Sequence, residues 1–419
     1  MSLPQTTKLS SIGAVILLTA SLSGAQTLAT GDSRNVSQPG YPGVCSTLSA
    51  QFTSSQRSSA PTSDDTSRIQ SALDSCKGTG KSVVLAASGS KNAFFSGGIT
   101  VDGEGLVVNS GVTLYGSKSY EGTSQLVLVN GSNSFIGGPG TIDGRGDLLS
   151  GSARLVQAKS IDNFIIYNVT LTQALHPNLY IEGGDGATVY SVSIKTPANR
   201  HNADGIDIDS ITNVSVVNST VNAGDDGIAI KTNSGAASNI TIKNSRFYGT
   251  HGISIGSQTM HGVSNILFTG NYVYGVDQNG ISSTDANAIN IKTDYDCGGT
   301  VNRVTYQNTC ITEAKHLIVL DTIYGSCSGT SGLPVFTDIV IDGVKSTNSV
   351  SSAYSRIRGY SSSDKINAYI ANIDLDTNAQ SDDQDAIIDL DNVNGFAPSG
   401  SGVSTNLFNL SGSIPNCSF

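Results

Sequence analysis

Asn213-Val-Ser-Val-Val is followed along the chain by Asn239-Ile-Thr-Ile and then by Asn265-Ile-Leu-Phe. Each stretch is rich in β-branched and apolar residues in alternation, which is typical of a strand with one buried face. Similar stretches, such as Asn163-Phe-Ile-Ile-Tyr and Asp338-Ile-Val-Ile, recur at intervals of roughly 20 to 30 residues, the range that indicates a solenoid or an array. The sequence therefore predicts a chain that winds into stacked turns.

Among repeat architectures, an all-β, right-handed parallel β-helix agrees best with this pattern. Helical periodicity is scarce after residue 80, so a fold of alternating strands and helices would lack its crossover helices. A propeller needs blades joined by hairpins, and two-residue hairpin turns are not regular here. With 47 Gly, 13% charged residues and no Trp, the composition agrees with an all-β scaffold. The core of a coil grows linearly, so 419 residues can form one domain.

The chain divides into three predicted segments. Residues 1–25 have a basic start, a short apolar stretch and small residues at the end, which is typical of a secretory signal peptide. Residues 26–60 form an N-terminal arm, and residues 61–419 form the β-helix catalytic domain. Within the latter, the segment from Asp64 to Cys76 has apolar residues at helical spacing and predicts a short helix that caps the coil. We expect a secreted, extracellular protein.

Six cysteines in a secreted protein predict up to three disulfides. Cys45 and Cys76 form a sensible pair, because a bond between them would tie the N-terminal arm to the capping helix. No cysteine spacing resembles a zinc site, and we expect neither a metal nor a cofactor. Three connectivities remain open for the other four cysteines, which are Cys297, Cys310, Cys327 and Cys417.

The charge excludes some partners. The chain has 33 Asp and Glu against 23 Lys and Arg, and its net charge is −10. Such a protein is a poor match to nucleic acid and to an anionic membrane surface. A local basic patch could still bind an anionic substrate, and His251, Lys292 and Lys231 are candidates for it.

Candidate catalytic residues lie in three motifs about one repeat apart. Asp204 lies in Asn-Ala-Asp-Gly, Asp225 and Asp226 lie in Gly-Asp-Asp-Gly, and His251 precedes Gly-Ile-Ser-Ile-Gly-Ser. Stacked turns place strands about 4.8 Å apart, which would bring these residues into one cluster. Lys292 joins it from a later turn if the Gly-, Asn- and Asp-rich stretch of residues 276–288 loops out.

Carboxylates flanked by cations suit hydrolysis of a glycosidic bond between acidic sugars. One carboxylic acid protonates the leaving oxygen, a carboxylate activates water, and cations hold the uronates. Crowding of three carboxylates raises the pKa of at least one of them. The adjacent like charges of Asp225 and Asp226 are hard to explain by folding alone.

The alternative interpretation is turn chemistry, because Asp-Gly and Asn-Gly pairs are common turns and any one motif alone is more readily a turn than a site. Asp207 and Asp209 alternate with isoleucines and are interpreted as facing solvent. Taken one at a time, six further residues are interpreted as having no function of their own; they are Lys231, Asp321, His176, His201, His261 and His316.

Taken together and in order, these motifs resemble those of the family 28 glycoside hydrolases, the polygalacturonases. The resemblance runs from about residue 60 to about residue 345. It implies a right-handed parallel β-helix, a pectic polysaccharide as the partner, and inverting hydrolysis of α-1,4-galacturonan by a protein that we expect to be a monomer. The stretches that carry it are Asn202-x-Asp204-Gly, Asp225-Asp226, His251-Gly-Ile-Ser-Ile-Gly-Ser, Ile291-Lys292, Gly140-Thr-Ile-Asp-Gly-Arg-Gly146 and His176-Pro-Asn-Leu.

By position, the resemblance implies roles for the catalytic residues. Asp225 would be the general acid, and Asp204 and Asp226 would hold and activate water. His251 would tune the protonation of the acid. An acidic pH optimum follows, because Asp225 must stay protonated and His251 charged.

The resemblance also implies substrate-binding residues. Lys292 would bind a substrate carboxylate, Tyr324 would contact sugar, and Asn202 would support the first aspartate. The family usually has Arg two residues before the lysine, where this chain has Asn290. Because Asn carries no charge and cannot grip a carboxylate with two parallel bonds, binding of galacturonate beside the scissile bond differs here.

Several functions remain open. Endo attack is favoured over exo attack, because no appended domain or large insertion is visible that would close one end of a groove. Asn290 is also consistent with a substituted or partly esterified pectin, or with compensation by another cation. A pectate lyase would share the coil and the substrate but would eliminate, normally with calcium and an Arg base. A non-catalytic β-solenoid that only binds carbohydrate is the last alternative.

Overall fold

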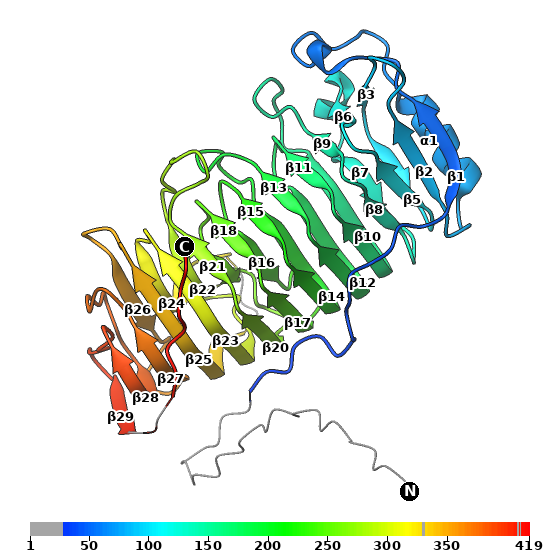
Figure 1. Cartoon of the computed structure of the whole chain (residues 1–419). Helices are drawn as coiled ribbons and strands as arrows, with labels where there is room; N and C mark the ends of the chain where they lie inside the picture. Colours follow the sequence, from blue (N-terminus) through cyan, green and yellow to red (C-terminus); the bar gives the residue numbers. More distant parts are fainter. Residues whose placement is uncertain (1–27, 329–331, 409, 411) are drawn as a thin grey trace, which may run out of the picture.

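A computed structural model describes residues 28–328, 332–408, 410 and 412–419 of the chain. These residues wind into a long right-handed coil of parallel strands (Figure 1). Every ladder between named strands in this part of the chain is parallel, so the predicted parallel β-helix is confirmed. The predicted signal peptide, residues 1–25, lies outside the described residues.

The ladders follow three faces of the coil. The first face carries the candidate site and contains β4 (Ile99–Val101), β7 (Gln125–Val129), the first halves of β10 (Arg154–Tyr167), β12 (Leu179–Tyr190) and β14 (Ile206–Val217), then β16 (Ile228–Lys231), β19 (Ile253–Ile255), β22 (Asn287–Asp294), β24 (His316–Gly325) and β26 (Tyr354–Arg358).

The second face begins at the N-terminal end and also includes the second halves of β10, β12 and β14. Its other strands are β1 (Val44–Ser49), β2 (Ser82–Ala86), β5 (Gly105–Val108), β8 (Phe135–Gly137), β17 (Ala237–Lys243), β20 (Val263–Thr269), β23 (Thr300–Thr312), β25 (Val335–Thr347), β27 (Ile366–Asp374), β28 (Ala386–Asn394) and β29 (Ser404–Phe408).

The third face consists of short strands and is continued by the ends of β23, β25 and β27. The short strands are β3 (Ala93–Ser96), β6 (Thr113–Gly116), β9 (Thr141–Asp143), β11 (Thr170–Thr172), β13 (Ser193–Lys195), β15 (Thr220–Asn222), β18 (Arg246–Tyr248) and β21 (Tyr272–Tyr274). Two short 3-10 helices, η1 (Ser54–Gln56) and η2 (Lys118–Gly122), lie in connecting segments.

The recurring asparagines turn the chain between faces. Asn213, Asn239 and Asn265 have φ values of 56°, 55° and 60°, in the left-handed region that Asn tolerates better than most residues. Their side chains form a ladder, in which Asn265 Nδ2 donates to Asn239 Oδ1 at 2.8 Å and Asn239 Nδ2 donates to Asn213 Oδ1 at 3.3 Å. These asparagines lie inside strands and not at their starts. Asn213 lies inside β14, which bends there from the first face to the second.

Apolar side chains from each turn stack along the inside of the coil. Val214 pairs with Ile240, Ile240 with Ile266, and Ile266 with Val304, and all four are fully buried. Burial of this kind contributes about 1.5–3 kcal/mol per large apolar side chain before entropy is counted. Because the pairing fixes which side chains point inward, it also fixes which ones point out from each face.

The N-terminal region covers one end and one side of the coil. Helix α1 (Thr66–Cys76) lies at the N-terminal end and buries Ile69 and Leu73 against the first strands (Figure 1). The segment before β1 runs along the second face across several turns. Its contacts include a hydrogen bond from Ala29 N to Thr305 Oγ1 at 2.9 Å and one from Gln38 Nε2 to the Tyr167 hydroxyl at 2.8 Å.

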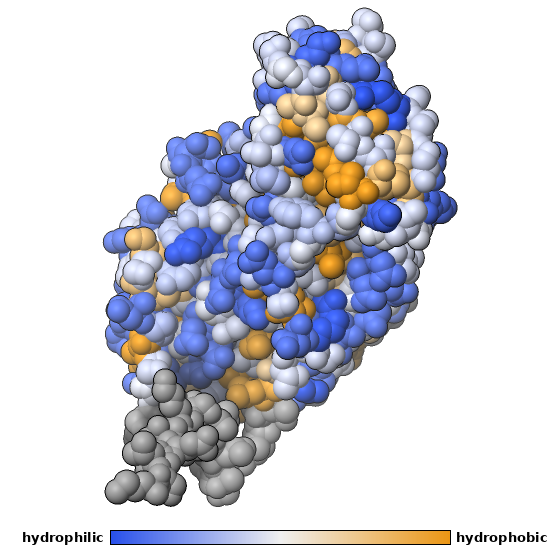
Figure 2. Space-filling view, turned by 45° about the vertical axis from the view of Figure 1, so that its right-hand side comes forward, coloured by the Kyte–Doolittle hydropathy of each residue, from blue (hydrophilic) through white to orange (hydrophobic). Residues whose placement is uncertain are grey.

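The surface in Figure 2 is mainly hydrophilic, with apolar patches toward the N-terminal end of the coil. A shallow hollow at this end is lined by Tyr41, Val44, Val84 and Val107, among others. No helix among the described residues is both long and apolar enough to cross a membrane.

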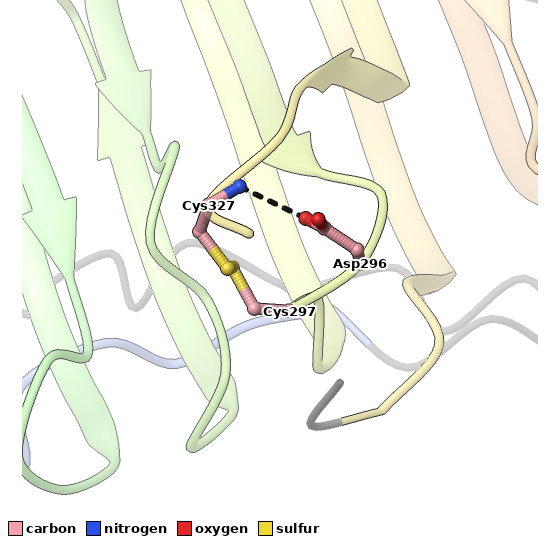
Figure 3. A group of neighbouring side chains, drawn as sticks. All are labelled: Asp296, Cys297 and Cys327. Atoms are coloured by element: carbon pink, nitrogen blue, oxygen red, sulfur yellow. Dashed lines mark hydrogen bonds between the residues drawn. A yellow bond between two sulfur atoms is a disulfide. The ribbon is translucent and has the colours of Figure 1, made fainter. Parts of the chain in front are cut away.

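Three disulfides link segments that the coil brings together. Cys45 is bonded to Cys76, so this prediction is confirmed, and of the three open connectivities the chain has Cys297–Cys327 and Cys310–Cys417. Figure 3 shows Cys297–Cys327 beside Asp296, which accepts a hydrogen bond from Cys327 N at 2.9 Å.

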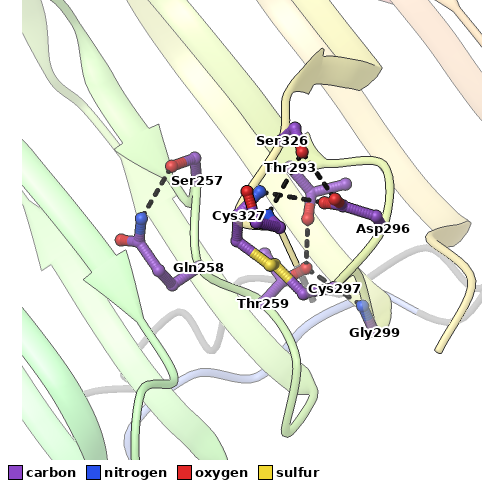
Figure 4. Close-up of a disulfide and its surroundings, with 10 residues drawn as sticks. Ser257, Gln258, Thr259, Thr293, Asp296, Cys297, Gly299, Ser326 and Cys327 are labelled. Carbon is purple, nitrogen blue, oxygen red and sulfur yellow. Dashed lines mark hydrogen bonds between the residues drawn. A yellow bond between two sulfur atoms is a disulfide. The ribbon is translucent and has the colours of Figure 1, made fainter. Parts of the chain in front are cut away.

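The Cys297–Cys327 bond joins the loop after β22 to the loop after β24, close to strand ends of the first face. Figure 4 shows the polar side chains around it, including Thr259 and Thr293, whose hydroxyls lie 2.6 Å apart. Both sulfurs are used in the disulfide, so the cluster of Asp296 with these cysteines offers a metal no thiolate ligand.

The bond between Cys310 and Cys417 closes a loop with a sequence separation of 107 and holds the C-terminal tail against β23. Loss of a cross-link over a loop of this size is expected to cost up to about 4.7 kcal/mol of unfolding free energy. We therefore predict that Cys310→Ser with Cys417→Ser lowers the Tm in a thermal denaturation experiment. A Tm equal to that of the wild-type protein would contradict the prediction.

Candidate active site

The predicted catalytic residues lie at one edge of the first face, in the turns that precede β14, β16 and β19. Backbone hydrogen bonds join these turns, because Gly205 N donates to Asp226 O and Gly227 N donates to Gly252 O, both at 2.8 Å. A side chain at Gly205 would place its Cβ 2.5 Å from Gly227 O. Glycine after Asp204 and after Asp226 therefore lets the turns stack closely enough to align the side chains.

Three carboxylates meet at this edge. One oxygen from each of Asp204, Asp225 and Asp226 lies within 4.8 Å of the other two. The side chain of Asp225 is 25% exposed, whereas those of Asp204 and Asp226 are 10% and 5% exposed. Asp225 is thus the member of the cluster most open to a molecule in the groove.

Asp225 forms an ion pair with His251. His251 Nδ1 lies 3.2 Å from Asp225 Oδ1, and the His251 backbone N–H donates to Asp225 O at 2.8 Å. Burial alone would raise the pKa of Asp225, but the hydrogen bond and charge of His251, together with the charge of Lys292, lower it to about 2. Burial likewise opposes a charged imidazole, but the Asp225 carboxylate raises the pKa of His251 above 6.5. Both groups of the pair are therefore charged at acidic pH above about 2.

Asp226 is the most enclosed of the three and forms a network with Lys292. Lys292 Nζ lies 3.0 Å from Asp226 Oδ2, and Ser254 Oγ donates to Asp226 Oδ1 at 2.7 Å. Burial raises the pKa of Asp226, and the neighbouring charges of Asp225 and Asp204 add to the shift against the opposing charge of Lys292. Asp225 and Asp226 therefore have pKa shifts in opposite directions, although they are adjacent in sequence.

Asp204 is held by Lys231, which the sequence indicated only as a candidate for a basic patch. Lys231 Nζ lies 3.2 Å from Asp204 Oδ2 and 3.0 Å from Asp207 Oδ1. The interpretation of Asp207 and Asp209 as facing solvent is wrong, because both are almost fully buried. They point away from the coil interior, but Lys231 and Tyr180 cover them, and Tyr180 donates to Asp209 at 2.6 Å. Burial and the charge of Asp204 raise the pKa of Asp207 well above its usual value.

A residue that the sequence did not single out is Asn178, from the His176-Pro-Asn-Leu stretch. Asn178 is fully buried, and both its backbone N–H and its Nδ2 donate to Asp204 O, at 3.0 and 2.9 Å. Asn178 therefore fixes the backbone that carries Asp204. Asn202, predicted to support Asp204, is an exposed residue with φ of 56° that lines the groove beside it.

The remaining predicted residues lie beside Lys292. Asn290 is buried, and its Nδ2 donates to Ser254 Oγ at 3.2 Å. Tyr324 is 55% exposed, and its ring centroid lies 5.1 Å from Lys292 Nζ. Residues 275–286 connect β21 to β22, so most of the stretch 276–288 lies between these strands and Lys292 reaches the cluster as expected.

Hollows on both sides of the carboxylates form a groove along the coil. The larger one, of about 610 Å³, is lined by Asn202, Asp204, Lys231, Arg154 and His176, among others. The smaller one, of about 170 Å³, lies on the other side and is lined by residues that include His251, Asn290, Lys292 and Tyr324. The carboxylate cluster thus lies between two open binding spaces.

The structure brings Asp204, Asp225, Asp226, His251 and Lys292 into one cluster, as stacking of the three motifs predicts. Two of the carboxylates contact a lysine, and the third contacts a histidine. Such a set can donate a proton, hold a water molecule and bind an anionic group within one site.

Comparison with known proteins supports this chemistry. The endo-polygalacturonase of Pectobacterium carotovorum subsp. carotovorum is 33% identical over 357 residues, which cover 75% of this chain and 83% of that protein. The polygalacturonase of Ralstonia solanacearum is 28% identical and covers 73% of this chain and 72% of its own length. The solved structure of a polygalacturonase from Erwinia carotovora ssp. carotovora superposes with a TM-score of 0.74 and 31% identity, over 85% of this chain and 99% of that one.

A family model described as "Glycosyl hydrolases family 28" matches residues 60–394, which include every residue of the cluster. The fold, the order of the motifs and the similarity over most of the chain agree with this match. The chain therefore belongs to glycosyl hydrolases family 28.

Proposed function

We propose that the protein is a secreted polygalacturonase that cleaves α-1,4-galacturonosidic bonds inside pectin chains with inversion. The observation that carries the proposal is the cluster of three aspartates with oxygens within 4.8 Å of one another, flanked by cations in an open groove. The names of relatives at 33% and 32% identity, both endo-polygalacturonases, support the substrate and the internal site of attack.

Asp225 delivers the proton to the leaving oxygen. It is the most exposed of the three carboxylates, and it is the one not contacted by a lysine in the ion pairs of the cluster. Because its pKa is about 2 in the free protein, a proton must move to it when the sugar binds. His251, charged and 3.2 Å away, is the nearest source of that proton. Displacement of water by the sugar favours the transfer, because it destabilises the charged carboxylate.

Asp204 and Asp226 hold the attacking water. Their close oxygens leave room for a water between them, and Lys231 and Lys292 keep both side chains in place. Inversion requires the water to attack the anomeric carbon from the face opposite the leaving oxygen. Asp204 and Asp226 must therefore hold the water on that face, while Asp225 protonates the leaving oxygen on the other.

The open groove supports endo attack. Hollows lie on both sides of the cluster, so sugars can occupy positions before and after the scissile bond. A carbohydrate-binding coil without activity would have no need of the buried Asp226–Lys292 pair, which is costly to desolvate. We infer from residues 1–25 that the protein is secreted, and we propose that it acts on the polymer as a monomer.

The first prediction from this function concerns products. Polygalacturonate is expected to release reducing sugar as a spread of oligomers early in digestion, with the first-formed anomer inverted when followed by NMR. The ultraviolet absorbance of the solution should not rise. Unsaturated, ultraviolet-absorbing products would instead indicate a pectate lyase, and monomer alone would indicate exo attack.

The second prediction separates the roles of the aspartates. Asp225→Asn, Asp204→Asn and Asp226→Asn should each reduce kcat on polygalacturonate, by about 10²–10⁴ for the general acid. An oligogalacturonide with an aryloxy leaving group needs little proton donation, so it should restore much of the rate in Asp225→Asn only. If this substrate restored the rate equally in Asp226→Asn, the assignment of Asp225 as the general acid would be wrong.

The third prediction concerns pH. The proton that reaches Asp225 comes from His251, so kcat/KM should fall on the alkaline side as pH rises through the raised pKa of His251. In His251→Gln this source of the proton is gone, and Asp225 must carry its own proton. A carboxyl group loses its proton at lower pH than an imidazolium, so the alkaline limb should move to lower pH. An alkaline limb that does not move would show that His251 does not supply the proton.

A further inference from the structure

The two cations of the smaller hollow that lie nearest the cluster, Lys292 and His251, are each already paired with one of its carboxylates. Asn290 is neutral there and is engaged with Ser254, and its neighbour Lys292 already contacts both oxygens of Asp226, at 3.3 and 3.0 Å. A uronate bound next to the cluster would therefore share Lys292 with a buried carboxylate. An anionic sugar on this side needs another cation.

The strand register indicates where that cation lies. Asn290 of β22 pairs with Val319 of β24, and Val319 pairs with Arg356 of β26. Strands lie about 4.8 Å apart, so the backbone of Arg356 is about 10 Å along the same column from that of Asn290. Arg356 lines the same hollow as Asn290 and Lys292, and the short side chain of Val319 separates them.

Arg356 shares the buried carboxylate of Asp321 with Arg358, and it also donates to Ser381 O and Ser381 Oγ, both at 3.3 Å. Asp321 is bound by Arg358 through both oxygens, at 2.9 and 2.7 Å, and lies 3.8 Å from Arg356 Nη1. The closer partner of Arg356 is Asp382, at 3.2 Å, and the Asp382 side chain is 69% exposed. Exposed ion pairs of this kind contribute little, so a substrate carboxylate can replace Asp382 at small cost.

We propose that Arg356 is a specificity-determining residue that binds the carboxylate of a galacturonate further from the scissile bond than the sugar at Lys292. The inference rests on the proposed function. A guanidinium grips a carboxylate with two parallel hydrogen bonds, which Asn290 cannot do. The protein then requires a free carboxylate on the sugar that binds Arg356 and not on the sugar beside the scissile bond. The sugar beside the bond can carry an ester or a substituent.

The test is the kinetics of Arg356→Gln on polygalacturonate and on lightly methyl-esterified pectin. A lost charge-assisted contact should raise KM for polygalacturonate about 10-fold. We expect kcat to change little, and the rise in KM to be smaller on the esterified polymer. Arg246→Gln is the matched control, because Arg246 lies on β18 of the third face against Tyr272 and should leave KM unchanged.

The same kinetics provide the outcomes that would overturn the inference. An unchanged KM in Arg356→Gln, an equal rise on both polymers, or a loss confined to kcat would each do so. If the Tm of Arg356→Gln shows that it does not fold, Arg356→Lys decides, because it keeps the charge and loses the paired donors. A raised KM then supports the inference, and an unchanged KM overturns it.

The wild-type protein separates this inference from the proposed function. If the wild type releases no sugar from polygalacturonate, the proposed function is wrong. If the wild type is active and KM is insensitive to Arg356, only the role of Arg356 is wrong.

Discussion

Parallel pairing of successive turns in fixed register is the constraint on which the site depends. Each turn is held to the next by strand ladders, by asparagine side chains at the bends and by a stacked apolar core. A slip of one residue between β14 and β16 would point Asp207 inward and an isoleucine outward. The register therefore aligns Asp204, Asp226 and His251 at one edge, although tens of residues separate them in the chain.

The electrostatics of the cluster follow from this crowding. Three carboxylates at one edge of the coil would repel one another, but each is paired with a cation. Lys231 contacts Asp204, Lys292 contacts Asp226, and His251 contacts Asp225. Asp225 and Asp226, adjacent in sequence, have opposite pKa shifts because one faces a charged histidine in the groove and the other is enclosed. Their environments separate the two carboxyl groups into different roles.

Sequence patterns predicted the coil and the central cluster because both depend on local, repeated signals. Alternating strands fix which face a residue occupies, and the three Gly-flanked motifs fall one turn apart. Asp207 was misplaced because alternation distinguishes the inside of the coil from the outside, but it does not distinguish solvent from a covered groove. Only the position of Lys231 over Asp207 shows that this outward residue is buried. Arg356 could not be predicted for a related reason, since it lies on a turn well beyond the motifs and shares the column of Asn290 only through register.

The direct test of the whole account is a crystal structure of Asp225→Asn with a galacturonate oligomer bound. The account predicts a glycosidic oxygen within hydrogen-bonding distance of the side chain at position 225, and a water between Asp204 and Asp226. An oligomer bound elsewhere on the coil, or a cluster whose carboxylates lie apart, would contradict it.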